Sequence, residues 1–175
     1  MQQISQVEAL KLIKARQKAG NHIDNRLLCA VEASTALFFL TLEDKATFLS
    51  LIWQEIDDSR LLTPGGPRTL RDVAQRMIDQ SWTFEKLTAD LGVPKNQHKP
   101  EWFKKCLDID AKFDFDRFGW VTVVPTTDGE RQQSPDGSFY IYDGVHKSLV
   151  LSKRLLSNEV EFQPIGALML LPRPR

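Results

Sequence analysis

The chain has 175 residues, 42% of them hydrophobic and 26% charged, with 23 basic side chains against 23 acidic ones. This length corresponds to one ordinary domain of about 100–200 residues, and the apolar fraction argues against global disorder. Formal neutrality gives no sign of the broad positive field of proteins that coat nucleic acid, and two cysteines are too few for a disulfide scaffold.

Targeting and membrane segments are not expected. The first residues lack the apolar core and the cleavage site of a signal peptide. The longest apolar run, residues 36–40, is far shorter than the roughly 20 residues that span a bilayer. We therefore expect a soluble, cytoplasmic protein that has no membrane partner.

The first part of the chain, residues 1–110, has the pattern of a mainly helical region. Apolar residues recur at every third position from Val7 to Ile13, which predicts a short amphipathic helix over residues 4–18. Residues 27–40 are apolar on nearly every face, so their period is ambiguous. We predict a buried helix there rather than a strand.

Further helices are expected in the second half of this region. Helical spacing of aromatic and aliphatic residues predicts one over residues 42–56. Thr69 and Asp72 have the spacing of a capping box and predict the start of the next helix. Two short helices are expected over residues 83–91 and 100–107.

The second part of the chain, residues 111–175, is rich in strand patterns. Residues 120–124 are β-branched and apolar on both faces, as in a covered strand. The predicted elements are strands over 120–124, 139–142, 160–162 and 165–171 and a helix over 145–156. Because strand, tight turn, helix and strand follow one another, we predict a βαβ unit with a right-handed crossover.

The fold class expected from these patterns is α+β. The helical region 1–110 would pack against a small mixed sheet formed by residues 111–175, and we expect the two regions to share one core.

The turn that links the strand over 139–142 to its helix has the most promising chemistry. Gly144 lets the backbone turn sharply or approach a ligand closely. The amides of the first helical turn have no intrahelical acceptor and carry the positive end of the helix dipole. We predict a phosphate-sized anion site made by Gly144, His146, Lys147 and Ser148. The alternative is that Asp143 caps the helix while His146 and Lys147 are solvated.

A family resemblance lies in the run from Phe139 to Leu156, FYIYDGVHKSLVLSKRLL. It resembles the ParB/sulfiredoxin superfamily, in which a strand, an Asp-Gly-x-His-Arg type of turn, a helix and a strand follow in this order. The resemblance covers about residues 118–172, and it implies a ParB/sulfiredoxin-like mixed sheet. It assigns the turn to Asp143 and Gly144, and a phosphate contact to His146.

This sequence departs from the family pattern in three places, and each departure argues against one of the properties that the resemblance would otherwise imply. Lys147 stands where the family usually has arginine, and lysine cannot make the planar bidentate fork of arginine. Val145 stands at the catalytic cysteine of sulfiredoxins, so sulfinic-acid reductase activity is not expected. The Gly-Glu-Arg-Arg type of box found in the chromosome-partition proteins is absent, so centromere binding is not expected either.

Three classes of function stay open on these grounds. The first is a phosphate-recognising module that binds a nucleotide or a nucleic-acid backbone, in a cleft lined by residues 126–137 and by Arg117 or Arg131. The second is a nuclease or nucleotide hydrolase, in which His146 moves protons or stabilises charge and Asp143 is a base or metal ligand. The sequence does not fix a cofactor for any of these classes, and a nucleotide with Mg²⁺ is the candidate. The third is a protein-interaction module with a vestigial pocket, whose helical first part binds a protein partner.

Other candidate residues have ordinary structural interpretations. Four aspartates lie near the border of the two regions: Asp108, Asp110, Asp114 and Asp116. We interpret them as the polar face of a half-solvated strand rather than as a Mg²⁺ or Ca²⁺ site, and no metal site is predicted. Cys29 is expected in the core. Cys106 follows two lysines, which would lower the pKa of its thiol if that thiol were exposed.

Overall fold

The computed structural model describes residues 1–18, 25–53, 69–89, 100–125 and 139–172. The strands are β1 (Gln2–Ile4), β2 (Ser34–Leu42), β3 (Trp120–Pro125), β4 (Phe139–Asp143) and β5 (Ile165–Pro172). The helices are α1 (Gln6–Lys18), α2 (Asn25–Ala33), α3 (Lys45–Ser50), α5 (Leu70–Asp79), α6 (Phe84–Thr88), α7 (Pro100–Ala111) and α8 (Val145–Leu156). A short 3₁₀ helix, η2 (Phe115–Arg117), precedes β3.

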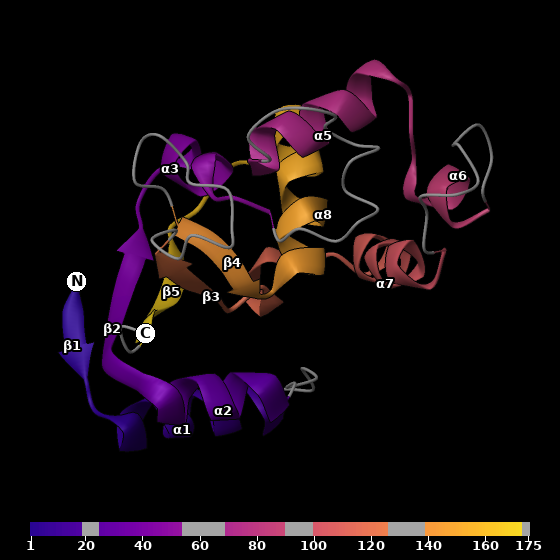
Figure 1. Ribbon diagram of the computed structural model, residues 1–175. Helices are drawn as coiled ribbons and strands as arrows, with labels where there is room; N and C mark the ends of the chain where they lie inside the picture. Colours follow the sequence, from indigo (N-terminus) through magenta and orange to yellow (C-terminus); the bar gives the residue numbers. More distant parts are fainter. Residues whose placement is uncertain (19–24, 54–68, 90–99, 126–138, 173–175) are drawn as a thin grey trace.

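The described residues form three layers, with one mixed sheet between two layers of helices. Figure 1 shows α1 and α2 on one side of the sheet and α3, α5 and α8 on the other. The strand order is β1-β2-β5-β3-β4, in which β3 and β5 are parallel and all other neighbours are antiparallel. The predicted α+β class is confirmed.

Each face of the sheet carries its own hydrophobic core. The larger core lies between the sheet and the layer of α3, α5, α7 and α8, with Phe48, Met77 and Leu149 fully buried. The smaller core lies between the sheet and α1 and α2, and it includes Ile13 and Leu168. Both faces of the central strands are therefore apolar, as the pattern of residues 120–124 predicted.

The apolar run over residues 27–40 is not one helix, and that prediction is wrong. α2 ends at Ala33 and the chain continues directly as β2. β2 pairs with β1 and β5, and its residues alternate between the two cores, with Leu37 in the smaller core and Phe38 against the larger one. A strand covered on both faces is apolar throughout, so it has no period that separates it from a buried helix. Region 1–110 thus supplies two strands of the sheet.

The predicted βαβ unit is also wrong in its strand pairing. β4 pairs antiparallel with β3, and β3 lies between β4 and β5. The parallel strands joined across a helix are therefore β3 and β5, with β4 and α8 between them in sequence. No strand forms over residues 160–162. Pairing of β4 with its neighbour in sequence competes with the crossover, and sequence order alone does not reveal which pairing forms.

Most of the other expected helices are present. The helix over 4–18 begins at Gln6, the helix over 100–107 continues to Ala111, and the capping box at the start of α5 is complete. Only α3 forms in the described part of residues 42–56, and α6 accounts for the described part of 83–91. The remaining residues of these two ranges lie outside the described parts of the chain.

The acidic cluster and Cys29 differ from expectation. Asp108 and Asp110 belong to α7, Asp114 caps η2 and Asp116 lies within it, so the predicted strand does not form. Burial of Phe103 and Cys106 holds this segment as a helix against α8. Cys29 is exposed on α2 rather than in the core, because Leu27 and Val31 supply the buried face of that helix.

Candidate functional site

The site is built around Gly144, the residue that joins β4 to α8. It has a left-handed backbone, with φ of 95° and ψ of 14°, and it is the N-cap of α8. A Cβ atom there would stand 3.0 Å from Lys147 Cε and 3.3 Å from Val121 Cγ1, so the position requires glycine. Among the described residues, no side chain caps α8. The first-turn amides are therefore left without a side-chain acceptor.

Asp143 does not cap the helix, so that alternative is wrong. Its Oδ2 accepts a hydrogen bond of 2.6 Å from Nη1 of Arg16, which comes from α1 on the other side of the sheet. The Arg16 side chain is 7% exposed, and its guanidinium lies 4.8 Å from the ring centroid of Trp120. Thr122 pairs with Asp143 in the sheet, and its buried hydroxyl has no hydrogen-bond partner. Sequence reasoning missed Arg16, which carried no local signal.

Lys147 points back toward the start of β3. Its Nζ donates to the backbone carbonyl of Trp120 at 2.7 Å and to that of Phe118, and it lies over the Phe118 ring. Gly119, with φ of 69°, separates the two accepting residues. Burial, followed by the nearby charge of Arg16, lowers the pKa of Lys147 to about 7, while Asp143 raises it. Lys147 thus holds α8 against β3, and its charge is directed toward the start of β3.

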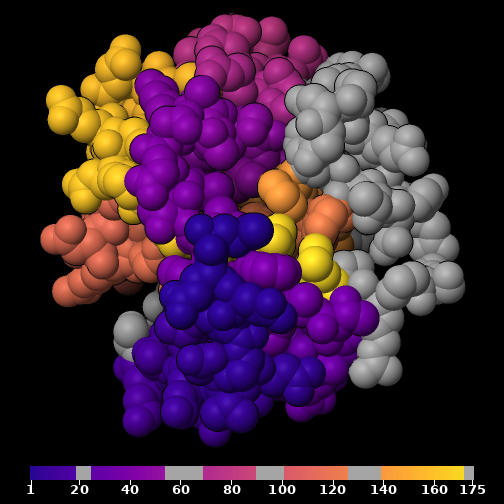
Figure 2. Space-filling view, turned by 90° about the vertical axis from the view of Figure 1, so that its left-hand side faces the viewer, coloured from indigo at the N-terminus to yellow at the C-terminus, as the bar shows by residue number. Residues whose placement is uncertain are grey.

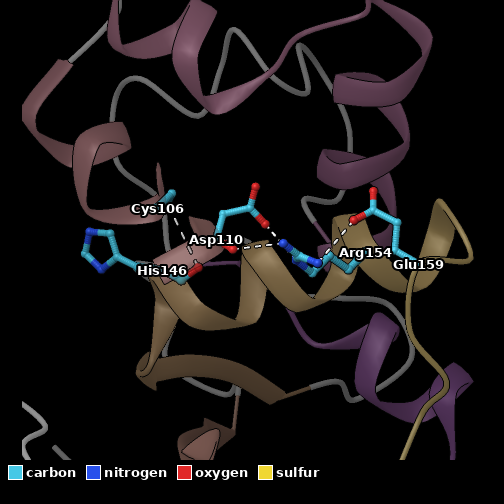
Figure 3. Close-up of polar contacts among 5 residues, drawn as sticks. All are labelled: Cys106, Asp110, His146, Arg154 and Glu159. Carbon is cyan, nitrogen blue, oxygen red and sulfur yellow. Dashed lines mark hydrogen bonds and ion pairs between the residues drawn. The ribbon is translucent and has the colours of Figure 1, made fainter. Parts of the chain in front are cut away.

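His146 turns toward α7 and stacks on Trp102. The two ring centroids are 4.1 Å apart and the rings are inclined by 27°. Figure 3 shows Cys106 next to the backbone carbonyl of His146, which accepts a hydrogen bond of 3.9 Å from the Cys106 thiol. Burial, followed by the charge of Lys105, lowers the pKa of His146 to about 4, while Asp143 raises it. The imidazole is therefore neutral near pH 7, and its buried Nε2 has no hydrogen-bond partner in the described part of the chain.

Ser148 and Cys106 both face the interior. Ser148 is fully buried, and its amide donates to the carbonyl of Gly144 at 3.0 Å. Its hydroxyl has no hydrogen-bond partner within the described ranges. Burial, followed by the charge of Asp110, raises the pKa of the Cys106 thiol well above its usual value. The two lysines before Cys106 therefore do not lower the pKa of its buried thiol, although they would lower the pKa of an exposed one.

The far end of α8 is tied to α7 by Arg154. Its guanidinium contacts Asp110 Oδ1 at 2.7 Å, the Asp110 carbonyl at 2.8 Å and Glu159 at 3.3 Å (Figure 3). This contact holds α7 against α8 and so helps to place Trp102 beside His146. Among the described residues, no group of three or more His, Cys, Asp or Glu side chains is arranged to hold a metal ion.

Of the other residues expected to line the site, Arg117 lies in the described part of the chain. Arg117 is 87% exposed and pairs with its neighbour Asp114 at 3.2 Å. Residues 126–137, including Arg131, lie outside the described parts of the chain. The predicted residues do not converge on one point: His146 points toward α7, Lys147 toward β3 and Ser148 inward, while Arg16 reaches Asp143 next to Gly144.

The charges near the turn leave one net positive charge below pH 7, where Lys147 is mainly protonated. Arg16 and Lys147 are the cations and Asp143 is the anion, and the positive end of the α8 dipole adds to them. Because the two cations are largely buried, solvent and salt screen them less than surface charges.

Comparison of the chain with protein-family models, curated proteins and solved structures returned no significant match. Across the described ranges, no helix has the length and apolar character needed to cross a membrane.

Proposed function

We propose that this chain is a phosphate-recognising module that binds a nucleotide or a nucleic-acid backbone at the amino end of α8. The observation that carries the proposal is the uncapped start of this helix at Gly144, next to the buried cations Arg16 and Lys147. Free amides and positive charge at one helix end favour an anion.

The proposed roles differ from those expected from sequence. The backbone amides of Val145 and His146 would contact the phosphate, because they belong to the uncapped first turn. Arg16 and Lys147 would supply positive potential without direct contact, since both already donate to other groups. The neutral His146 ring stacks on Trp102 and its Nε2 is buried, so the ring would position the first turn rather than contact the ligand.

The order of elements also supports the proposal. β3, β4, α8 and β5 follow one another as the resemblance to the ParB/sulfiredoxin superfamily implies, with Gly144 at the turn before the helix. That likeness is what suggests a nucleotide or nucleic-acid phosphate rather than another anion.

The first test is a thermal-shift screen of the wild-type protein with ribonucleotides, deoxynucleotides and short oligonucleotides, each with and without Mg²⁺. A ligand at about 100 times its Kd should add about 2.7 kcal/mol to the free energy of unfolding. If no phosphate compound raises the melting temperature, the proposal fails.

The second test uses two variants that break one ion pair and change the charge of the site in opposite directions. Arg16→Gln removes a positive charge and Asp143→Asn removes a negative one, while both lose the same contact. We expect phosphate affinity to fall about tenfold in the first and to rise about tenfold in the second. Equal weakening in both variants would show that the pair acts only through the fold.

A further inference from the structure

The outward face of α1 carries a row of three lysines. Lys11, Lys14 and Lys18 are all exposed, and their spacing by three and four residues places them on one side of the helix. Ala9 and Ile13 are buried on the opposite side, against the sheet. Figure 2 shows α1, in indigo, at the surface of the molecule.

This row is a concentration of positive charge in a chain that is neutral as a whole. Arg16 points inward to Asp143, so the exposed side of α1 carries the three lysines and Glu8, which leaves two net positive charges. Hydrogen bonds from Ser5, followed by the charge of Lys11, lower the pKa of the nearby Glu8 carboxyl. Within the described ranges, no carboxylate forms a salt bridge with any of the three lysines. In the described ranges, Glu32 on α2 is an exposed carboxylate of the same layer. Further exposed carboxylates lie on or next to elements of the opposite layer, among them Glu43, Asp44, Asp114, Asp116, Glu159 and Glu161.

We infer that the outward face of α1 binds the phosphodiester backbone of a nucleic acid. Lys11 and Lys18 are about 10 Å apart along the helix axis, at 1.5 Å per residue. Duplex DNA carries about one charge per 1.7 Å of its axis, so several phosphates lie within reach of this row. Lysine is a flexible point charge, which suits contacts to a backbone rather than to base edges.

A nucleic acid fits this face better than a membrane does. Helices that lie in the membrane surface insert an apolar face, but the apolar residues Ala9 and Ile13 of α1 are occupied by the sheet. Val7 is the large hydrophobic residue exposed on the lysine side, at the beginning of the row. The outward surface of α1 is therefore suited to contact with a charged ligand rather than to insertion into a membrane.

The experiment measures fluorescence anisotropy of a short labelled DNA duplex and of a short RNA strand at several potassium chloride concentrations. The test variant is Lys11→Gln, Lys14→Gln and Lys18→Gln together. The matched control is Lys86→Gln, Lys104→Gln and Lys112→Gln, which removes the same charge from exposed positions on α6, on α7 and just after α7.

We expect the slope of log affinity against log salt for the duplex to become shallower by about 2–3 in the α1 variant, and to stay unchanged in the control. Equal loss in both variants, or none in the α1 variant, would overturn the inference. Binding to anionic lipid vesicles but not to DNA or RNA would overturn it in favour of a membrane. The α1 variant keeps the α8 site intact, so mononucleotide binding should persist in it if the proposed function holds.

Discussion

Lys147→Met offers a direct test of how α8 is anchored to β3. Burial lowers the pKa of Lys147 from 10.5 to about 7 in the folded protein. Between these values the unfolded chain binds more protons at this residue than the folded protein does. The free energy of unfolding of the wild type should therefore rise with pH in this window, by at most about 1.4 kcal/mol per pH unit. Methionine does not titrate, so the variant lacks this contribution.

The magnitude follows from the two pKa values. Between pH 7 and pH 9, the wild type should gain about 2 kcal/mol relative to Lys147→Met. The variant also loses the hydrogen bonds to Trp120 and Phe118, but this loss is a constant offset that does not change with pH. The assay is urea unfolding followed by tryptophan fluorescence at several pH values.

An exposed lysine on α7 provides the control for this experiment. Lys104→Met should follow the wild-type pH profile with only a constant offset, because its side chain is exposed in the folded protein. If the profiles of wild type and Lys147→Met are parallel between pH 7 and pH 9, the ammonium group is not buried as the structure places it, and the reasoning is refuted.

Three further predictions concern the same region. Gly144→Ala and Gly119→Ala should each lower the free energy of unfolding by about 1 kcal/mol or more, because both positions have positive φ. The loss should be larger for Gly144→Ala, because only there would the added Cβ crowd its neighbours. Equal losses would contradict this difference in crowding. As pH falls from 6.5 to 4, the wild type should lose about 3 kcal/mol of unfolding free energy, because the unfolded chain protonates His146 more readily than the folded protein does. His146→Phe should not show this loss, and urea unfolding across the pH range would detect the difference. A double-mutant cycle of Arg154→Met and Asp110→Asn should give a coupling of about 1 kcal/mol, whereas additive effects would show that this contact does not tie α7 to α8.

Local signals in the sequence determined several features of this protein. The capping box at Thr69 and Asp72, the helix α1 and the turn at Gly144 all follow from hydrogen bonds, apolar spacing or backbone freedom within a few residues. These interactions join residues that are close in sequence, so a pattern in the sequence reports them directly.

Tertiary structure decided the composition of the sheet and the character of the site. β2 is a strand because it pairs with β1 and β5, although its apolar run fits a buried helix equally well. Arg16 reaches Asp143 across 127 residues of sequence, which no local pattern can indicate. Whether Lys147 faces solvent or β3, and whether His146 is charged, depends on burial by distant elements, because desolvation acts through what surrounds a group in space rather than in sequence.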